Sequence, residues 1–290
     1  MPKDAMFSEE EQVLNQAGKV VSDERYKDSP LHAGFVSLLD SYQRLFKQVR
    51  RLIRLSDKQQ HGMILELEQA FESFVRTLVA TIDAKHRLTA GHSTRVTEYV
   101  LFIGKKMGFS DEQMEVLKYA GLLHDIGKIG IPDAVLTKNG PFSPDERLKM
   151  NEHATWTWQI LSVIRLPRNL CEIPKMAACH HEKMDGTGYP YGLKGDDIPF
   201  FSRLIAVADV FDALTSRRDY PKYDREQILS PDPMSMDKAF SILTKDQNIH
   251  FDPTVVSVVL NHRPEFEAMW QSLHTNHADA LPVCLPSAIL

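Results

Sequence analysis

Cysteine is scarce in this sequence, and it contains no long uncharged apolar run. The three cysteines among 290 residues, Cys171, Cys179 and Cys284, are too few and too unevenly spaced for a disulfide framework. This predicts a protein of a reducing compartment. No apolar stretch reaches the roughly 20 residues of a membrane-spanning helix, and the acidic residues 1–10 lack the apolar core of a signal peptide. We therefore expect a cytoplasmic protein without membrane insertion.

The chain also lacks a strong excess of either charge. Lys and Arg total 34 against 39 Asp and Glu, for a formal net charge of -5. This balance argues against a broad electrostatic surface for duplex nucleic acid or for an anionic membrane. A phosphate-bearing ligand must then be held by a local group of residues. Hydrophobic residues make up 43% of the chain, which is an ordinary value for a folded globular protein.

Proline is missing from residues 31–83, and glycine occurs there only as Gly34 and Gly62. Such a stretch permits one long helix or two helices. Apolar residues recur in it at steps of three and four: Leu38, Tyr42, Leu45, Val49, Leu52, Met63, Leu67, Ala70, Phe74 and Leu78. This stripe suits a helix packed within its own chain and equally a homodimeric coiled coil. The sequence leaves both alternatives open.

Beyond residue 84 the sequence is typical of a succession of helices. Capping-box patterns occur at residues 110–113 and 143–146, and Pro144 stands where a first-turn proline is tolerated. Strand-like alternation is scarce, and the stretches 129–132 and 185–199 have the composition of loops between helices. The predicted fold class is therefore all-α.

Histidines and carboxylates stand at positions where burial would be costly. His124 and Asp125 end the apolar helical run 116–123, so two polar side chains lie where a buried helix meets a loop. Asp209 interrupts the apolar run 204–211, where a lone carboxylate would be desolvated. A hydrogen-bonded His-Asp pair would explain the first feature by itself. A metal ion would satisfy both, and mixed nitrogen and oxygen donors suit Fe, Mn or Zn.

A glycine-rich loop, residues 185–190, follows the double histidine His180-His181. Its two glycines allow the backbone to approach a ligand closely, although an ordinary turn explains them equally well. The double histidine alone would also suit a solvated helix end. The spacing of the two features in one segment is what indicates a ligand site.

His124-Asp125, together with His-His-Glu-Lys-Met-Asp-Gly-Thr-Gly-Tyr-Pro at residues 180–190, resembles the paired signature of HD-GYP domains, a branch of the HD phosphohydrolases. The resemblance extends over about residues 83–262. It implies an HD-domain helical bundle around a two- or three-metal centre, usually of iron or manganese, and a cyclic dinucleotide substrate. We expect a catalytic domain at 83–265, an N-terminal helical region for dimerisation or signal relay at 1–82, and a helix end with a flexible tail at 266–290.

The resemblance also implies roles for individual residues. One metal ion would be held by His92, His124, Asp125 and Asp209, and the other by Asp125, His153, His180 and His181. The implied catalytic residues are Lys128, Asp125 and Asp212, and the implied substrate-binding residues are Tyr189, Gly188, Arg218, Tyr220 and Lys222. Two cations about 3.5–4 Å apart can activate a water molecule and neutralise a phosphodiester. Asp212 would orient that water or a ligating side chain.

The sequence departs from the family pattern at three places. Members with a third metal carry a glutamate where this chain has Leu88, so we predict two metal ions, iron or alternatively manganese. Family members often carry a basic residue just after the equivalent of Tyr220. This chain has Pro221 there, so we expect weaker binding of the second phosphate. Thr157 stands where the family commonly has a glycine.

The implied function is hydrolysis of cyclic di-GMP to pGpG, or further to GMP. The alternative is a catalytically weak cyclic-dinucleotide sensor or protein-interaction module. A nucleoside-triphosphate phosphohydrolase of HD type is disfavoured by the loop at 185–190, which simpler HD enzymes lack. The expected partners are a second copy of the chain, bound through the N-terminal helices, and an upstream sensor or GGDEF-type protein.

Overall fold

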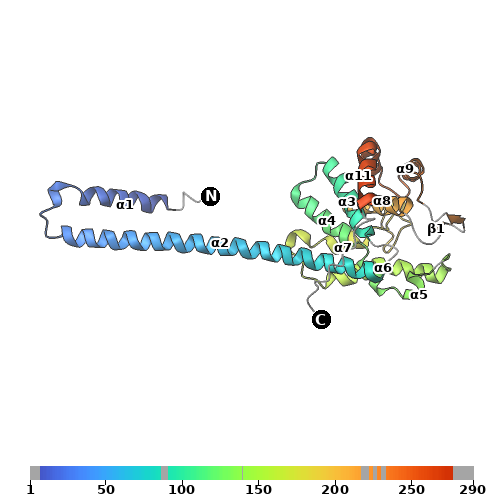
Figure 1. The fold of residues 1–290 in the computed structure, drawn as a ribbon, viewed down its shortest axis with the longest axis horizontal. Helices are drawn as coiled ribbons and strands as arrows, with labels where there is room; N and C mark the ends of the chain where they lie inside the picture. The colour runs from blue at the N-terminus through green and yellow to red at the C-terminus, as the bar shows by residue number, and fades with distance from the viewer. Residues whose placement is uncertain are drawn as a thin grey trace. The chain divides into compact units, whose positions relative to one another are not determined.

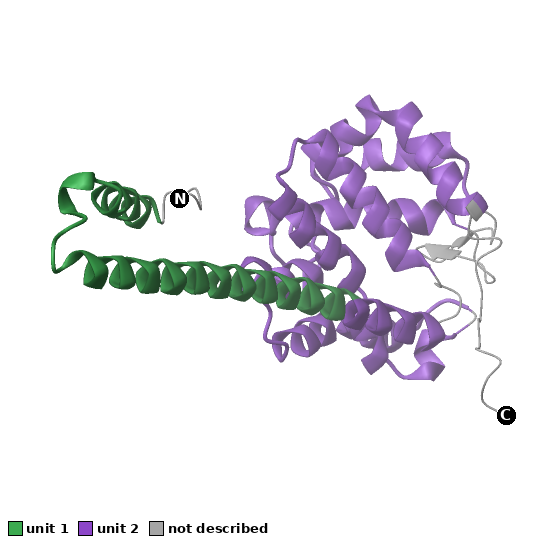
Figure 2. Cartoon of the chain, turned by 60° about the vertical axis from the view of Figure 1, so that its left-hand side comes forward, with its two compact units in different colours: residues 1–72 green, residues 73–290 purple. Residues whose placement is uncertain are grey.

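The computed structural model describes residues 7–85, 91–138, 140–216, 222–224, 227–229 and 233–276. The chain divides into two compact units, residues 1–72 and 73–290 (Figure 2). The predicted all-α class is confirmed, since helices make up nearly all regular structure in the described ranges. A small antiparallel hairpin of β1 (Lys222–Asp224) and β2 (Gln227–Leu229) is the departure there. Strands of three residues are too short to produce a readable alternation. The expected tail, 278–290, lies outside the described residues.

The first unit is built from α1 (Ser8–Val21), the 3-10 helix η2 (Glu24–Tyr26) and most of α2 (His32–Lys85) (Figure 1). α2 is one continuous helix of 54 residues, so the one-helix alternative is confirmed. The Phe7 ring, which precedes α1, lies edge-on to Phe46 of α2 with ring centroids 5.4 Å apart. Arg50 stacks on both rings and pairs with Glu11. These contacts hold α1 against one face of α2.

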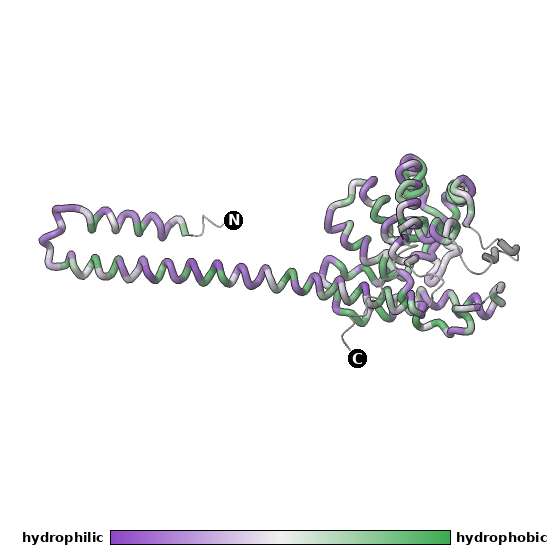
Figure 3. Tube along the Cα trace, in the orientation of Figure 1, coloured by the Kyte–Doolittle hydropathy of each residue, from purple (hydrophilic) through white to green (hydrophobic). Residues whose placement is uncertain are grey.

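The apolar stripe predicted from the sequence lies on a different face of α2. Between residues 36 and 53 of α2, the half-buried positions are 36, 39, 43, 46, 50 and 53, and they include Phe46 and Arg50. The stripe positions remain exposed: Leu38 by 66%, Leu45 by 57% and Leu52 by 65%. Apolar and polar residues alternate along the whole helix (Figure 3). In this structure, therefore, α1 covers one heptad-spaced stripe of α2, and the stripe from Leu38 to Leu52 has no cover within the unit.

The second unit starts with the last turns of α2, which bury Val75, Val79 and Ile82. In its described residues it continues with nine further α-helices: α3 (His92–Lys106), α4 (Asp111–Leu123), α5 (Asp133–Leu136), α6 (Pro144–Ser162), α7 (Ile173–Ala178), α8 (Phe200–Thr215), α9 (Met236–Lys245), α10 (Pro253–Asn261) and α11 (Arg263–Asn276). Three 3-10 helices connect them: η4 (Ile126–Gly130), η5 (Arg168–Leu170) and η6 (Gly195–Asp197). No helix in the described ranges combines the length with the apolarity that a membrane crossing requires.

The predicted capping boxes are both present. At the start of α4, the Ser110 side chain accepts from the backbone N–H of Gln113, and the Gln113 side chain accepts from the backbone N–H of Ser110. Ser143 and Glu146 do the same at the start of α6, where Pro144 is the first helical residue. Each box satisfies two backbone donors that the helix leaves unpaired. The starts of the two helices that lead to His124 and His153 are thereby defined locally.

Aromatic rings form the core that joins α3 to α8. Tyr99 of α3 and Phe211 of α8 are fully buried, with ring centroids 5.5 Å apart. Phe266 of α11 lies 4.9 Å from Phe211 and 5.3 Å from Tyr99. Rings at such separations and angles add to the free energy of their burial. This cluster fixes the relative positions of α3, which carries His92, and α8, which carries Asp209.

η4 crosses α6 at very close range. A Cβ atom on Gly127 would lie 1.9 Å from the carbonyl oxygen of His153 and 2.4 Å from the backbone nitrogen of Thr157. No side chain fits there, so glycine is required for this approach. The turn after α4 is thus pressed directly against the backbone of α6.

We predict that Gly127→Ala destabilises the second unit by about 3 kcal/mol, since the added methyl group must push two backbones apart. The matched control is Gly62→Ala in α2, where a Cβ would meet nothing within 4 Å and where alanine favours the helix by about 1 kcal/mol. Urea unfolding followed by circular dichroism measures both changes. Equal stability of Gly127→Ala and the parent chain would contradict the close packing.

Candidate metal centre

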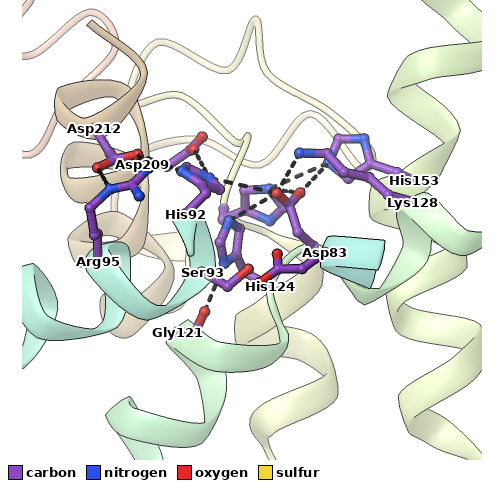
Figure 4. A network of polar contacts seen from close by, with 12 residues as sticks. Asp83, His92, Ser93, Arg95, Gly121, His124, Lys128, His153, Asp209 and Asp212 are labelled. Atoms are coloured by element: carbon purple, nitrogen blue, oxygen red, sulfur yellow. Dashed lines mark hydrogen bonds and ion pairs between the residues drawn. The ribbon is translucent and has the colours of Figure 1, made fainter. Parts of the chain in front are cut away.

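Side chains from separate segments of the second unit converge on one point (Figure 4). They come from the start of α3, the α4–η4 turn, the middle of α6, the segment after α7 and the second half of α8. Three groups with ligand atoms within 4.8 Å of one another are present: His153, His180 and His181; His92, His124 and Asp209; His124, Asp125 and His180. The structure therefore brings together all seven residues expected to be metal ligands.

Three of the histidine rings are held by backbone carbonyl groups of the helices that precede or carry them. His124, His153 and His180 each donate from Nδ1 to the backbone carbonyl three residues earlier, at 2.7, 2.7 and 2.6 Å. A carbonyl oxygen can only accept, so Nδ1 carries the hydrogen and Nε2 presents a lone pair. Metal-binding histidines commonly have this arrangement, in which a partner on the other nitrogen fixes the ring.

The Nε2 atoms of these rings face Asp125. They lie 3.3 Å (His124), 3.5 Å (His153) and 3.9 Å (His180) from its carboxylate oxygens. The Nε2 atoms of His153 and His180 are only 3.4 Å apart, and the buried Nε2 of His124 has no hydrogen-bond partner. Lone pairs directed at one another and at a carboxylate repel, and a buried acceptor without a donor is costly. A cation would reverse the sign of these interactions.

His92 is held by carboxylates instead of carbonyl oxygens. Its Nδ1 donates to Asp212 at 2.8 Å, while its Nε2 lies 3.1 Å from Asp209 and 3.6 Å from Asp125. Arg95, one turn further along α3, grips both oxygens of Asp212 at 2.8 and 2.9 Å. Asp212 thus orients His92, as a partner of a ligating side chain would. Sequence reasoning missed Arg95, although its i+3 spacing from His92 places both on one helix face.

Burial keeps three of the histidines neutral. It lowers the pKa of His180 to about 3, with further lowering by the nearby His124 and His153. The pKa of His181 is lowered well below its usual value, and that of His153 is lowered too, in both cases mainly by burial. Imidazoles must be neutral to bind a metal ion, so these three are in the required state at neutral pH.

The carboxylates are held in their anionic form. Burial alone would raise the pKa of Asp125, but the charge of Lys128 outweighs it and lowers that pKa well below its usual value. Hydrogen bonding to His92 does the same for Asp209. Burial disfavours a charge on His92, but Asp209 and Asp212 overcome this and raise its pKa to about 9. A proton on His92 and a divalent cation would therefore compete for the same carboxylates.

The residues fit two divalent metal ions. One group contains His92, His124 and Asp209, another contains His153 and the double histidine, and Asp125 lies with His124 and His180. The first two groups contain members of the two ligand sets that the resemblance implied, and Asp125 groups with one member of each. Which residues hold which ion stays a prediction. Their mixture of imidazole nitrogen and carboxylate oxygen suits Fe, Mn or Zn.

The glycine-rich loop lies beside the double histidine. The ring of Tyr189 is 4.8 Å from that of His181 and 6.3 Å from that of His153. A Cβ on Gly188 would lie 2.5–2.6 Å from backbone atoms of residues 181–183. This glycine is therefore required by close packing of the loop on its own segment. Its role in binding a substrate stays a prediction.

Two further features hold this loop, and sequence reasoning missed both. The buried carboxylate of Glu182 accepts from the backbone N–H groups of Tyr191 and Leu193 at 2.7 and 2.9 Å. The backbone N–H groups of residues 184 and 185 donate to the carbonyl oxygens of residues 250 and 249. The segment 249–250 thus supports the loop through its backbone.

A family model described as HD domain matches residues 76–255 of the chain. This protein belongs to the HD domain family. The resemblance seen in the sequence is thereby confirmed, and metal dependence goes with that family and with the His/Asp cluster.

The chain is similar to several curated proteins. A 3'3'-cGAMP-specific phosphodiesterase 2 of Vibrio cholerae is 34% identical over 252 residues, which are 87% of this chain and 46% of that protein. A probable cyclic di-GMP phosphodiesterase of the same organism is 34% identical over 233 residues, 76% of this chain and 51% of that protein. The chain thus spans about half the length of these relatives. A solved structure of a cyclic GMP-AMP-specific phosphodiesterase of V. cholerae has a TM-score of 0.47 and 20% identity, covering 69% of this chain and 52% of that one.

Some of the predicted site residues of this HD domain stay predictions. Arg218 and Tyr220 lie outside the described residues, and of Lys222 only the backbone, in β1, is described. Leu88 and Pro221 also lie outside them. The described part of the site therefore includes the proposed ligands, Lys128, Asp212 and the loop, but not the proposed phosphate-binding segment.

Thr157 has a clear structural role in this HD domain. Its buried hydroxyl accepts from the N–H of Gly127 and donates to the carbonyl oxygen of His124, both at 3.0 Å. It lies one turn after His153 on α6. The hydroxyl therefore ties the turn that carries His124 and Asp125 to the helix that carries His153.

We predict that Thr157→Val lowers metal affinity about 10-fold, the lower end of the range for losing a partner of a metal-binding segment. Valine has the same shape but leaves two buried backbone groups unpaired. Thr157→Ser keeps the hydroxyl and should retain near-normal affinity. Thr97→Val is the matched control, because that buried hydroxyl donates within its own helix to Ser93. Chelator competition measures the affinities, and equal values for Thr157→Val and the parent chain would show that the bridge positions no ligand.

Proposed function

We propose that this chain is a metal-dependent phosphodiesterase that opens the ring of a cyclic dinucleotide, with cyclic di-GMP as substrate and pGpG as first product. The observation that carries the proposal is the ring of Nε2 lone pairs around the anionic Asp125. The names of the relatives support the substrate class, since they include both cyclic di-GMP and 3'3'-cGAMP phosphodiesterases. The proposed cofactor is a pair of divalent ions, iron or alternatively manganese.

The chemistry follows from what surrounds the cluster. Two divalent ions would lower the pKa of an attacking water and neutralise the charge that develops on the phosphate. Lys128 pairs with Asp125 at the centre of the cluster, where its ammonium group is placed to donate to a phosphate oxygen. Tyr189, packed on His181, offers a ring against which a base can stack. Asp212 and Arg95 keep His92 in position.

Substitutions separate catalysis from binding. We predict that Asp125→Ala abolishes metal binding and lowers hydrolysis by about 1000-fold or more, which corresponds to roughly 4 kcal/mol of the activation barrier. Tyr189→Ala should spare the metal ions and weaken substrate binding. Tyr191→Ala is the control for it, because that neighbouring tyrosine is 52% exposed and should behave like the parent chain. The measurements are metal content and chromatography of products from cyclic di-GMP and 3'3'-cGAMP after loading with Fe(II) or Mn(II).

The same assay tests the alternative function. Tight binding of a cyclic dinucleotide by the metal-loaded chain without turnover would favour the sensor or protein-interaction module. Full activity of Asp125→Ala would refute the proposed centre. Turnover of 3'3'-cGAMP but not of cyclic di-GMP would keep the reaction and change the substrate.

We also propose that a second copy of the chain covers the exposed stripe of α2. α1 occupies a different face of the helix, so two such hairpins can pair through Leu38, Leu45 and Leu52 into a bundle of four helices. Apolar side chains at this spacing have no other cover in the first unit, and leaving them in water forgoes about 2 kcal/mol for each.

Glutamates introduced into the exposed stripe of α2 test whether the chain dimerises through it. Leu45→Glu combined with Leu52→Glu should weaken dimerisation more than about 100-fold, since each copy loses two buried leucines. Leu148→Glu serves as the control, because it introduces the same charge at a 65% exposed leucine of α6. Analytical ultracentrifugation over a concentration series measures the dissociation constants. A parent chain that stays monomeric at high micromolar concentration would refute this interface.

A further inference from the structure

The end of α2 lies against the candidate metal centre. Its last buried residues, Val75, Val79 and Ile82, anchor it in the second unit. Immediately after them, two charged side chains reach away from the helix. Asp83 contacts the backbone at the start of α3, and Lys85 contacts the backbone of the segment 129–131.

Asp83 holds the segment that carries His92. Its carboxylate accepts from the backbone N–H of Gly91 at 3.0 Å. Gly91 has a positive φ of 74° and is the N-cap of α3, where its lack of a side chain leaves the helix without a cap of its own. An acidic group at a helix N-terminus is favourable and satisfies a backbone donor. Asp83 therefore sets the position at which α3 begins, one residue before a proposed ligand.

Lys85 holds the segment that follows Lys128. Its ammonium group donates to the carbonyl oxygens of Ile129 and Ile131, at 2.6 and 2.9 Å, and lies 3.6 Å from Asp133. An ammonium group has three donors, and two of them close this short loop around Gly130. The loop is continuous with η4, so Lys85 constrains the backbone from which Lys128 reaches Asp125.

We propose that Asp83 and Lys85 are positioning residues that couple the N-terminal helix to the site, so that a rotation of α2 moves the segments at 91–92 and 129–131 together. α2 is uninterrupted for 54 residues, and a continuous helix transmits rotation about its axis. The apolar stripe is broken by the polar residues 56–60, and such a change of interval alters the winding of packed helices. This inference rests on the proposed function only for its activity readout. The source of the input, expected to be a sensor or GGDEF-type partner, stays a prediction.

The contacts are tested first by hydrogen exchange, which requires no catalysis. Asp83→Ala should speed exchange at the start of α3 and lower metal affinity, each by about 10-fold, whereas Asp83→Asn keeps an acceptor for Gly91 and should stay within about threefold of the parent chain. Lys85→Met should speed exchange across residues 126–132 and lower the hydrolysis rate while metal content is retained. Asp40→Ala and Lys58→Met, earlier in α2, are the matched controls. Parent-like exchange in both anchor variants would overturn the proposal.

The coupling is tested by insertions after Gln60 in the full chain. Two alanines rotate the upstream part of α2 by about 200° relative to the anchors, whereas seven alanines come within about 20° of two whole turns. The two-residue insertion should change exchange in both segments, and the hydrolysis rate, by more than about threefold, and the seven-residue insertion should not. In the Asp83→Ala, Lys85→Met background the two insertions should behave alike. An unchanged two-residue variant, or a difference that persists in this background, would refute the coupling. If the predicted changes in hydrogen exchange occur but no variant, nor the parent chain, hydrolyses a cyclic dinucleotide, the coupling stands and the proposed function fails.

Discussion

The repulsion among buried acceptors around Asp125 is the constraint on which the rest of this structure depends. Three imidazole rings present Nε2 lone pairs to one ionised carboxylate, and Nε2 of His124 has no hydrogen-bond donor at all. Burial lowers the pKa of His153 and His180, so these rings do not relieve the repulsion by taking up protons. A divalent cation bound by these groups would replace the repulsion between acceptors with an attraction of each acceptor to the ion.

The surrounding fold keeps these groups from moving apart. Backbone carbonyl oxygens three residues earlier in the chain hold the rings of His124, His153 and His180. The aromatic core between α3 and α8 fixes the helices that carry His92 and Asp209. The Thr157 hydroxyl and the glycine contact at 127 press the central turn onto α6. The site is thus rigid through packing at several independent points, as preorganised ligands require.

Much of the fold could be predicted from local patterns. The capping boxes, the first-turn proline of α6 and the absence of helix breakers between residues 31 and 83 each act within a few residues, so the sequence alone located the starts of α4 and α6 and the extent of α2. The hairpin of β1 and β2 escaped prediction, because strands of three residues carry too little pattern. The packing of Gly188 on backbone atoms of residues 181–183 also escaped prediction, because it depends on how the loop folds back on its own segment.

The sequence by itself determined the set of candidate ligands, the helical class and the apolar stripe of α2, because composition, spacing and family motifs are properties of neighbouring residues. Only the tertiary structure decided which face of α2 is covered by α1, what the Thr157 hydroxyl binds, and that Arg95, Glu182, Asp83 and Lys85 support the site. These are hydrogen bonds and ion pairs, most of them between residues distant along the chain, and such contacts leave no periodic trace in the order of amino acids.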